Sequence, residues 1–206
     1  MKIWLRIALA LALLAFPGAA AFAKDKKPAA PTTPGKYTEW GGEIDELEVV
    51  APFRLAEYSH IAVEPFDNSE TPLPDADDNS YAPAKAVLAK AAHSFTEGLS
   101  ESLPKLQAAV TEPGKEAGPG TLVVRGKVTT MDPGSKAARY WGGFGAGAAR
   151  TEISGEVVDA GSGKVLLRFL QERRSGWGLF GGDYEKLMNR NLRAIGEDLA
   201  GALTHF

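Results

Sequence analysis

The hydrophobic residues of this chain recur with two different periods, which places strands and helices along it. Residues 55–66 are predicted to form a strand, in which Ile61 and Val63 point to one face and Ala62 and Glu64 to the other until Pro65 ends the run. Residues 82–106 instead repeat apolar side chains every three or four positions. This spacing predicts a helix with one buried stripe, formed by Ala84, Val87, Leu88, Ala91, Phe95, Leu99, Leu103 and Leu106.

The second half of the chain repeats both patterns. Period-two alternation returns in three segments, at residues 122–128, 150–159 and 165–173. Ala160–Gly163 is short enough to join the last two as a hairpin. Helical spacing returns from Tyr184 to Leu203, and Asp183 is placed to cap that helix. Residues 43–50 stay ambiguous between a short strand and a helical turn.

The predicted order of elements is therefore β-α-β-β-β-α. Consecutive strands of a meander pair antiparallel, and two helices with apolar stripes need a sheet face to bury against. We expect an α/β fold of the α+β type: a two-layer sandwich with a mainly antiparallel sheet and two helices on one face. No internal repeat or second domain is visible, so residues 43–206 form a single predicted domain.

The first 42 residues are predicted to be a signal peptide followed by a linker. Lys2 and Arg6 precede an apolar run that ends at Pro17-Gly18, and Ala21-Phe22-Ala23 offers small residues where a signal peptidase cleaves. The apolar run is about half of what a membrane span needs. We expect residues 1–23 to be a signal peptide cleaved after Ala23, which sends the protein to the periplasm or outside the cell. The proline-rich residues 24–42 are predicted to form a linker.

Composition narrows the classes of protein further. The chain has no cysteine, which excludes disulfides and a lipid anchor on cysteine. Residues 24–120 carry 9 basic against 17 acidic side chains, and residues 121–206 carry 12 against 9. The acidic balance of the whole argues against a nucleic-acid partner. Membrane contact without an anchor, and an oligomer, both stay open.

Two glycine-rich segments with aromatic residues are the most unusual feature of the sequence. The first, Arg139–Gly147, comes close to a dinucleotide-binding fingerprint, but a strand follows it where that chemistry needs a helix N-terminus. The second, Gly176–Gly182, has the same character. Antiparallel strand order puts both segments at the same edge of the sheet.

These segments have two interpretations. Their aromatic rings either fold onto the sheet or stay exposed and bind a partner. On the second interpretation, the predicted partner-binding residues are Arg139, Tyr140, Trp141, Phe144, Trp177 and Phe180.

Catalytic and metal-binding candidates are poor. The three histidines, His60, His93 and His205, have no spacing typical of metal ligands. The acidic residues 67–78 do not match a calcium-binding loop. We therefore predict no catalytic residue, no metal and no cofactor. The alternative is a hydrolase or another enzyme with an unfamiliar site, using Asp67, His60 or Arg139.

The chain resembles a bacterial envelope family of unknown function, DUF4410. The resemblance rests on Gly134-Ser135, Arg139-Tyr140 and the glycines of 143–147, and continues in Val158-Asp159, Gly163-Lys164-Val165 and Gly181-Gly182-Asp183. It covers about residues 55–203. Many members of that family are lipoproteins, and this chain lacks the cysteine that would make it one.

A more remote similarity is to the curli-secretion channel subunits and related periplasmic domains. It rests on the Ile-Ala-Val-Glu-Pro-Phe run of residues 61–66. That resemblance implies an α/β building block of envelope assemblies. Together these observations predict a non-enzymatic binding or assembly module with an envelope protein as partner.

Overall fold

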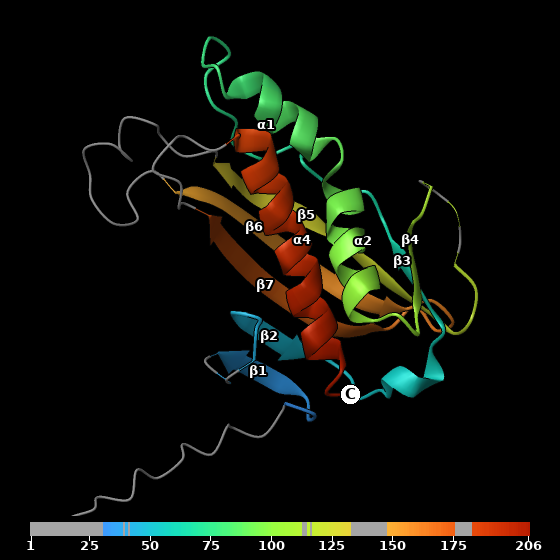
Figure 1. The fold of residues 1–206 in the computed structure, drawn as a ribbon. Coiled ribbons are helices and arrows are strands. Elements are labelled where there is room, and N and C mark those ends of the chain that lie inside the picture. The colour runs from blue at the N-terminus through green and yellow to red at the C-terminus, as the bar shows by residue number, and fades with distance from the viewer. Residues whose placement is uncertain are drawn as a thin grey trace, which may run out of the picture.

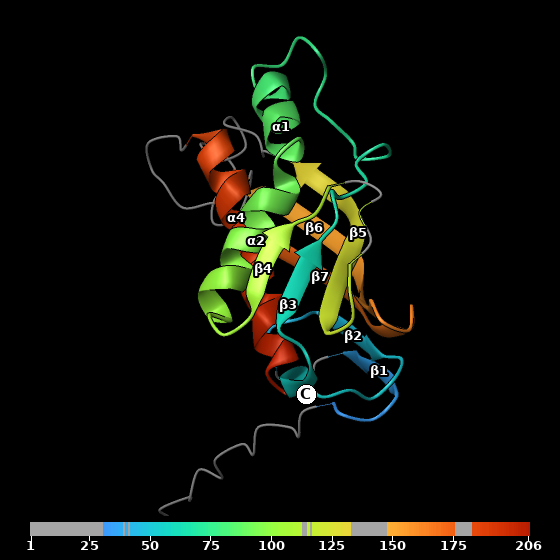
Figure 2. The same ribbon diagram turned by 90° about the vertical axis from the view of Figure 1, so that its right-hand side faces the viewer.

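The computed structural model describes residues 31–38, 40, 42–112, 115, 117–132, 148–175 and 183–206. Within these residues, seven strands form one sheet and three α-helices cover one of its faces (Figures 1 and 2). The predicted signal peptide and residues 24–30, 39 and 41 of the predicted linker lie outside this part of the chain. No helix in the described residues is both long and apolar enough to cross a membrane.

Ten helices and strands follow one another along the described chain. They are β1 (Gly35–Thr38), β2 (Glu46–Val49), β3 (His60–Val63), α1 (Tyr81–Leu88), α2 (Ala91–Ser102), β4 (Gln107–Val110), β5 (Thr121–Asp132), β6 (Ala149–Asp159), β7 (Val165–Ser175) and α4 (Tyr184–Leu203). A single turn of 3-10 helix, Leu55–Glu57, precedes β3.

The strands lie in the order β1-β2-β7-β6-β5-β3-β4. The meander β5-β6-β7 is antiparallel. Residues 133–148 connect β5 to β6, and residues 160–164 connect β6 to β7. One of these connections is a tight turn in which Gly163 adopts a left-handed φ of 69°. Helices α1 and α2 lead from β3 to β4, which lies parallel to β3, since a parallel pair needs a crossover. β3 is also parallel to β5.

The core lies between the sheet and the helices. Alternate residues of the three long strands point toward the helices, and Val124, Ile153 and Leu167 are fully buried there. They belong to one hydrophobic cluster with Phe95 of α2 and Leu199 of α4. The opposite face of the sheet has no helix over it in either view (Figures 1 and 2). The fold is therefore two-layered, with one face of the sheet left open.

Two glycines let helices α2 and α4 approach each other closely. A β-carbon at Gly98 would lie 2.0 Å from the carbonyl oxygen of Arg193, and one at Gly196 would lie 2.1 Å from that of Phe95. Each helix therefore rests a glycine against the backbone of the other. No residue with a side chain fits at either position without moving the helices apart.

The long periodic elements agree with the sequence predictions. The predicted helical stripe is buried from Ala84 to Leu103, and β5, β6 and β7 each contain the strand predicted for them. Helix α4 spans the predicted residues, and the side chain of Asp183 caps it by accepting a hydrogen bond from the backbone N–H of Glu185. The α+β class and the antiparallel majority of strand pairs are confirmed.

The predicted β-α-β-β-β-α sandwich with two helices is too small. The sheet contains three additional strands, β1, β2 and β4, and the helix predicted over residues 82–106 divides into α1 and α2. Strand β1 lies within the segment predicted as linker, so part of that segment belongs to the sheet. These strands have four residues each, and a four-residue segment is too short to show a clear period.

Candidate functional site

The six predicted partner-binding residues lie outside the described residues. They are Arg139, Tyr140, Trp141, Phe144, Trp177 and Phe180. The structure does describe the residues on either side of the two segments that contain them. These flanking residues define the candidate site.

The flanking residues of both segments meet at one end of the sheet. Asp132, the last residue of β5, is the register partner of Arg150 on β6. Ala149, the first residue of β6, is the register partner of Ser175, the last residue of β7. The ends of three neighbouring strands thus carry the chain into and out of both segments, as the antiparallel order predicts.

A buried asparagine joins these strand ends to helix α4. The side-chain amide of Asn191 donates to the carbonyl oxygens of Ala149, at 3.3 Å, and Arg173, at 3.1 Å. Its side-chain oxygen accepts a hydrogen bond from the Ser175 hydroxyl, to which the Arg190 guanidinium also donates at 3.3 Å. Buried polar groups are costly unless they are paired. We call this set the Asn191 cluster, and it fixes the flanks of both segments against one helix.

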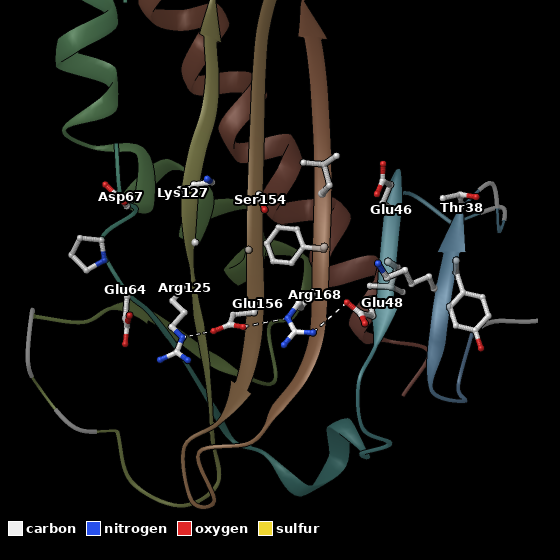
Figure 3. A pocket seen from close by; sticks show the side chains of 18 residues that line it. Thr38, Glu46, Glu48, Glu64, Asp67, Arg125, Lys127, Ser154, Glu156 and Arg168 are labelled. Atoms are coloured by element: carbon white, nitrogen blue, oxygen red, sulfur yellow. Dashed lines mark hydrogen bonds and ion pairs between the residues drawn. The ribbon is translucent and has the colours of Figure 1, made fainter. Parts of the chain in front are cut away.

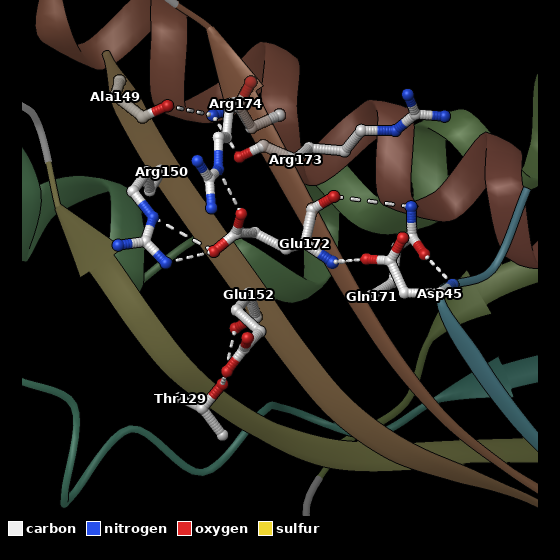
Figure 4. A network of polar contacts seen from close by, with 10 residues as sticks. Asp45, Thr129, Ala149, Arg150, Glu152, Gln171, Glu172, Arg173 and Arg174 are labelled. Atoms are coloured by element: carbon white, nitrogen blue, oxygen red, sulfur yellow. Dashed lines mark hydrogen bonds and ion pairs between the residues drawn. The ribbon is translucent and has the colours of Figure 1, made fainter. Parts of the chain in front are cut away.

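On the open face, the same end of the sheet carries a group of charges (Figure 4). Glu172 lies between Arg150 and Arg174 and forms ion pairs with both. Its register partner on β6 is another acid, Glu152, which accepts a hydrogen bond from the hydroxyl of Thr129. Two acids directly opposite each other repel. The arginines offset that repulsion and leave exposed guanidinium groups beside the strand ends.

The arginines also determine the acidity of Glu172. Partial burial raises the pKa of the Glu172 carboxyl, but the hydrogen bonds and positive charges of Arg150 and Arg174 outweigh burial. The pKa of Glu172 is therefore lowered overall, and that of Arg150 is raised. Both shifts favour the charged forms of Glu172 and Arg150.

A second polar group ties the N-terminal strands to the body. Gln171 accepts a hydrogen bond from the backbone N–H of Asp45 at 2.7 Å, and the Asp45 carboxylate accepts one from the N–H of Glu172 at 2.9 Å (Figure 4). On its other side, the Gln171 amide donates to Asp198 of α4 at 2.9 Å. Arg173 pairs with the same carboxylate.

Asp198 is the most deeply buried acid in this group. Its side chain is 5% exposed. Burial raises the pKa of the Asp198 carboxyl, and this exceeds the opposing effect of the hydrogen bonds from Arg173 and Gln171. Gln171 and Arg173 of β7 both donate hydrogen bonds to the Asp198 carboxylate, so this group joins helix α4 to the sheet.

The open face of the sheet also forms a shallow hollow of about 660 Å³ (Figure 3). Gly126 and Gly155, which are register partners, are among the residues that line it. Across it runs a row of four register partners in alternating charge, Arg125, Glu156, Arg168 and Glu48. The Arg125–Glu156 contact is 2.7 Å and the Arg168–Glu48 contact is 3.3 Å. The charges of this row are paired within the sheet.

The residues of the enzyme alternative do not form a site together. His60 is exposed at the start of β3, where its Nδ1 lies 2.7 Å from the Ser59 hydroxyl. Asp67 lies beyond the other end of that strand and accepts a hydrogen bond from the backbone N–H of Ser69 at 2.9 Å. Their partners on β5 are Thr121 and Lys127, six residues apart, which is roughly 20 Å along a strand. Arg139 lies outside the described residues.

The other polar candidates are also apart from one another. Hydrogen bonds to Ser69 are the main reason that the pKa of the exposed Asp67 is lowered. His93 is exposed on α2, and His205 packs edge-on against Trp40 with ring centroids 5.5 Å apart. The part of the chain that the structure describes contains no group of three residues able to hold a metal ion.

Comparison with known families identifies the chain's family. The profile of a domain of unknown function, DUF4410, matches residues 61–178, more than half of the chain. The chain belongs to this family. The match begins at β3 and extends past the end of β7, so it includes the strand ends that define the candidate site. No curated protein matches the sequence.

Three solved structures are similar in part. A single-residue variant of PelC from Paraburkholderia phytofirmans, described as a dodecamer, has 12% identity and a TM-score of 0.47, covering 77% of this chain and 95% of that one. A DUF330 protein from Xanthomonas campestris has 10% identity, a TM-score of 0.42, and covers 69% and 81%. Lipoprotein GNA1162 from Neisseria meningitidis has 16% identity, a TM-score of 0.36, and covers 71% and 99%. Likenesses at this level transfer neither activity nor assembly to this chain.

Proposed function

We propose that this protein is a non-enzymatic binding or assembly module of the bacterial envelope. It is exported, released into the periplasm or outside the cell by cleavage after Ala23, and held at the envelope by an unidentified protein partner. It uses no cofactor. The contacts come from the two glycine-aromatic segments, through Arg139, Tyr140, Trp141, Phe144, Trp177 and Phe180.

One observation carries this proposal: the first segment leaves and re-enters the sheet, and the second segment leaves it, at neighbouring strand ends. Asp132, Arg150, Ala149 and Ser175 are neighbours in the sheet, and the Asn191 cluster holds their backbone in place. Binding residues are often found on loops that a rigid scaffold positions. A pair of segments rich in glycine and large aromatic residues, joined to one rigid end of a sheet, matches that arrangement.

The chemistry of the flanks indicates what kind of surface would bind. Arg150 and Arg174 have side chains that are 42% and 63% exposed beside the strand ends. Aromatic residues and arginine are enriched in the centres of protein interfaces. A protein partner with an apolar patch and acidic residues around it would be complementary to this end of the sheet.

The proposal is tested by crosslinking in the periplasm of cells that produce the full chain. Variants Trp141→Ala and Trp177→Ala are compared with Leu73→Ala, which removes an exposed apolar side chain from a different loop. We expect both tryptophan variants to lose the crosslinked partner and the Leu73 variant to keep it. Thermal unfolding of each purified variant checks that the fold is intact. The same crosslinked partners in all three variants would refute the proposal.

A further inference from the structure

Strand β4 forms one edge of the sheet, and no strand in the described part of the chain pairs with its outer side. The opposite edge strand, β1, follows Pro34 and contains Lys36. Proline and lysine on an edge discourage pairing with another chain. Strand β4 has the sequence Gln-Ala-Ala-Val and contains neither. It is thus the edge without that protection.

The hydrogen bonds to β3 show which backbone groups of β4 remain free for pairing. Gln107 donates its N–H to Ser59 at 3.0 Å, and Thr111 donates to Val63 at 2.9 Å. In a parallel ladder, alternate residues bond to the same neighbour. The N–H and C=O groups of Ala108 and Val110 therefore point away from β3, toward the outer side of the sheet.

The side chains of β4 separate by face in the same way. Ala108 and Val110 are partly buried and pack at the margin of the hydrophobic core, on the side of the helices. Gln107 and Ala109 are exposed on the open face. A strand added to this edge would cover the apolar pair and leave the polar side in contact with water.

We propose that β4 pairs antiparallel with β4 of a second copy of this chain, around a two-fold axis at Ala109. Ala108 then lies opposite the second copy's Val110, and Val110 lies opposite its Ala108. Both are hydrogen-bonded pairs, so all four outward-pointing groups on each strand find partners. An interface of this kind uses the same surface on both subunits.

The side chains favour a second copy as the occupant because the segment is complementary to itself in this register. On the helix side, the apolar Ala108 and Val110 face each other. On the open side, Gln107 lies opposite the second copy's Thr111, two side chains that can hydrogen-bond to each other. At the axis, two alanines meet where the strands approach most closely. The four residues of β4 carry no charge.

Neighbouring registers fit less well. If the two β4 strands shifted by one residue, the outward-pointing N–H and C=O groups of one strand would face residues of the second strand whose N–H and C=O groups already bond to their own β3. A shift by two residues would leave one outward-pointing residue outside the four-residue strand. The contact is short, so we expect a dimer whose population depends on protein concentration. This inference does not depend on the glycine-aromatic segments.

A cysteine placed at the proposed axis tests the register directly, because the native chain has none. In a non-hydrogen-bonded pair at the axis, Ala109→Cys would bring two sulfurs within disulfide distance. Gln107→Cys is the matched control on the same face, since its two copies would lie about 13 Å apart along the strands. The exposed Leu73→Cys measures how fast two chains crosslink by random collision. Under a mild oxidant we expect Ala109→Cys to crosslink about tenfold faster than either control.

A charge exchange provides a second readout. Ala109 is exposed, so Ala109→Lys and Ala109→Glu leave the core intact, but each places like charges together at the axis. Sedimentation of each variant alone should show a monomer, and an equal mixture should form the mixed dimer. Two results would overturn the proposal: a native chain that stays monomeric at high concentration, or Ala109→Cys crosslinking no faster than Leu73→Cys.

Discussion

The two faces of strands β5, β6 and β7 hold polar side chains in different ways. On the face covered by helices, polar side chains are few, and Asn191 and Asp198 of α4 each bond to specific groups on β7. On the open face, Arg125, Glu156 and Arg168 form a row of partly exposed charges. The same strands therefore support a specific buried network on one side and a solvated ladder on the other.

This difference shows where the geometry of the candidate site comes from. A buried hydrogen bond is costly to lose, because the remaining partner stays without water. An exposed ion pair contributes little, because water and salt screen it. The Asn191 cluster on the covered side should therefore determine where the strand ends lie. The charged residues of the open side determine what those ends present to a partner.

The largest difference between covered and exposed positions should appear within helix α4. Gly196→Ala places a β-carbon against the carbonyl of Phe95, and we expect it to lower the free energy of unfolding by about 2–3 kcal/mol. Gly201→Ala is the matched control, because the nearest atom there is a side-chain carbon of Glu43 at 3.9 Å. It should be neutral or stabilise by up to about 1 kcal/mol. Urea unfolding of both variants measures this, and equal effects would contradict the close helix contact.

A smaller difference should separate the polar groups of the two faces. Asn191→Ala leaves the carbonyl groups of Ala149 and Arg173 without their buried donor, and should cost about 2 kcal/mol. Arg168→Ala removes a half-exposed charge from the open face and should cost no more than about 1 kcal/mol. Urea unfolding at low and high salt provides the test. Only the Arg168 effect should shrink with salt, and an Asn191 effect as small as that of Arg168 would show that the cluster is not structural.

The smallest expected effect is on the pH dependence of stability. It concerns Asp198 and Glu172, whose pKa values shift in opposite directions. Burial raises the pKa of Asp198, so the folded protein holds that proton more tightly than the unfolded chain does. The contribution of Asp198 to stability should then rise as the pH falls from neutrality toward the ordinary aspartate value of about 3.9. Glu172 is also penalised by burial, but Arg150 and Arg174 lower its pKa overall. Its contribution is present above about pH 4.3 and is lost as the pH falls through the lower folded value.

Variants Asp198→Asn and Glu172→Gln separate these two contributions. Each is compared with the native chain by urea unfolding between neutral and acidic pH. On acidification, the stability difference between the native chain and Asp198→Asn should move in favour of the native chain. The difference for Glu172→Gln should move against it. A change of the same sign for both variants would contradict the contrast between the faces.

The sequence predicted those parts of the fold that carry a long pattern. The stripe from Ala84 to Leu103 and the alternation of the three long strands repeat often enough to define which side is buried. Strands β1 and β4 were not predicted, and β2 lies in the segment that the pattern left open between a strand and a helical turn. For β2 and β4, a strand that pairs with them lies far away in the sequence, so the local pattern does not show the pairing. The division between α1 and α2 was missed for a related reason, since a stripe can continue across a change of helix direction.

The sequence predicted where the candidate site lies, but not which hydrogen bonds hold it in place. Antiparallel order alone indicated that the two glycine-aromatic segments leave the sheet at the same end. Asn191 occupies a stripe position of the last helix, and a polar residue at such a position is a usable signal of a buried hydrogen bond. Its partners could not be identified in advance, because two of them are backbone carbonyls on β6 and β7.

By itself, the sequence determined the alternation of the long strands, the buried stripes of the helices and the membership in the DUF4410 family. The alternation and the stripes are local properties, since each depends on the order of residues within one segment. Tertiary structure alone decided that the sheet has seven strands, that Asn191 fixes the strand ends, and that β4 is an unprotected edge. These depend on which distant segments share hydrogen bonds, and a backbone group leaves no mark of its partner in the sequence.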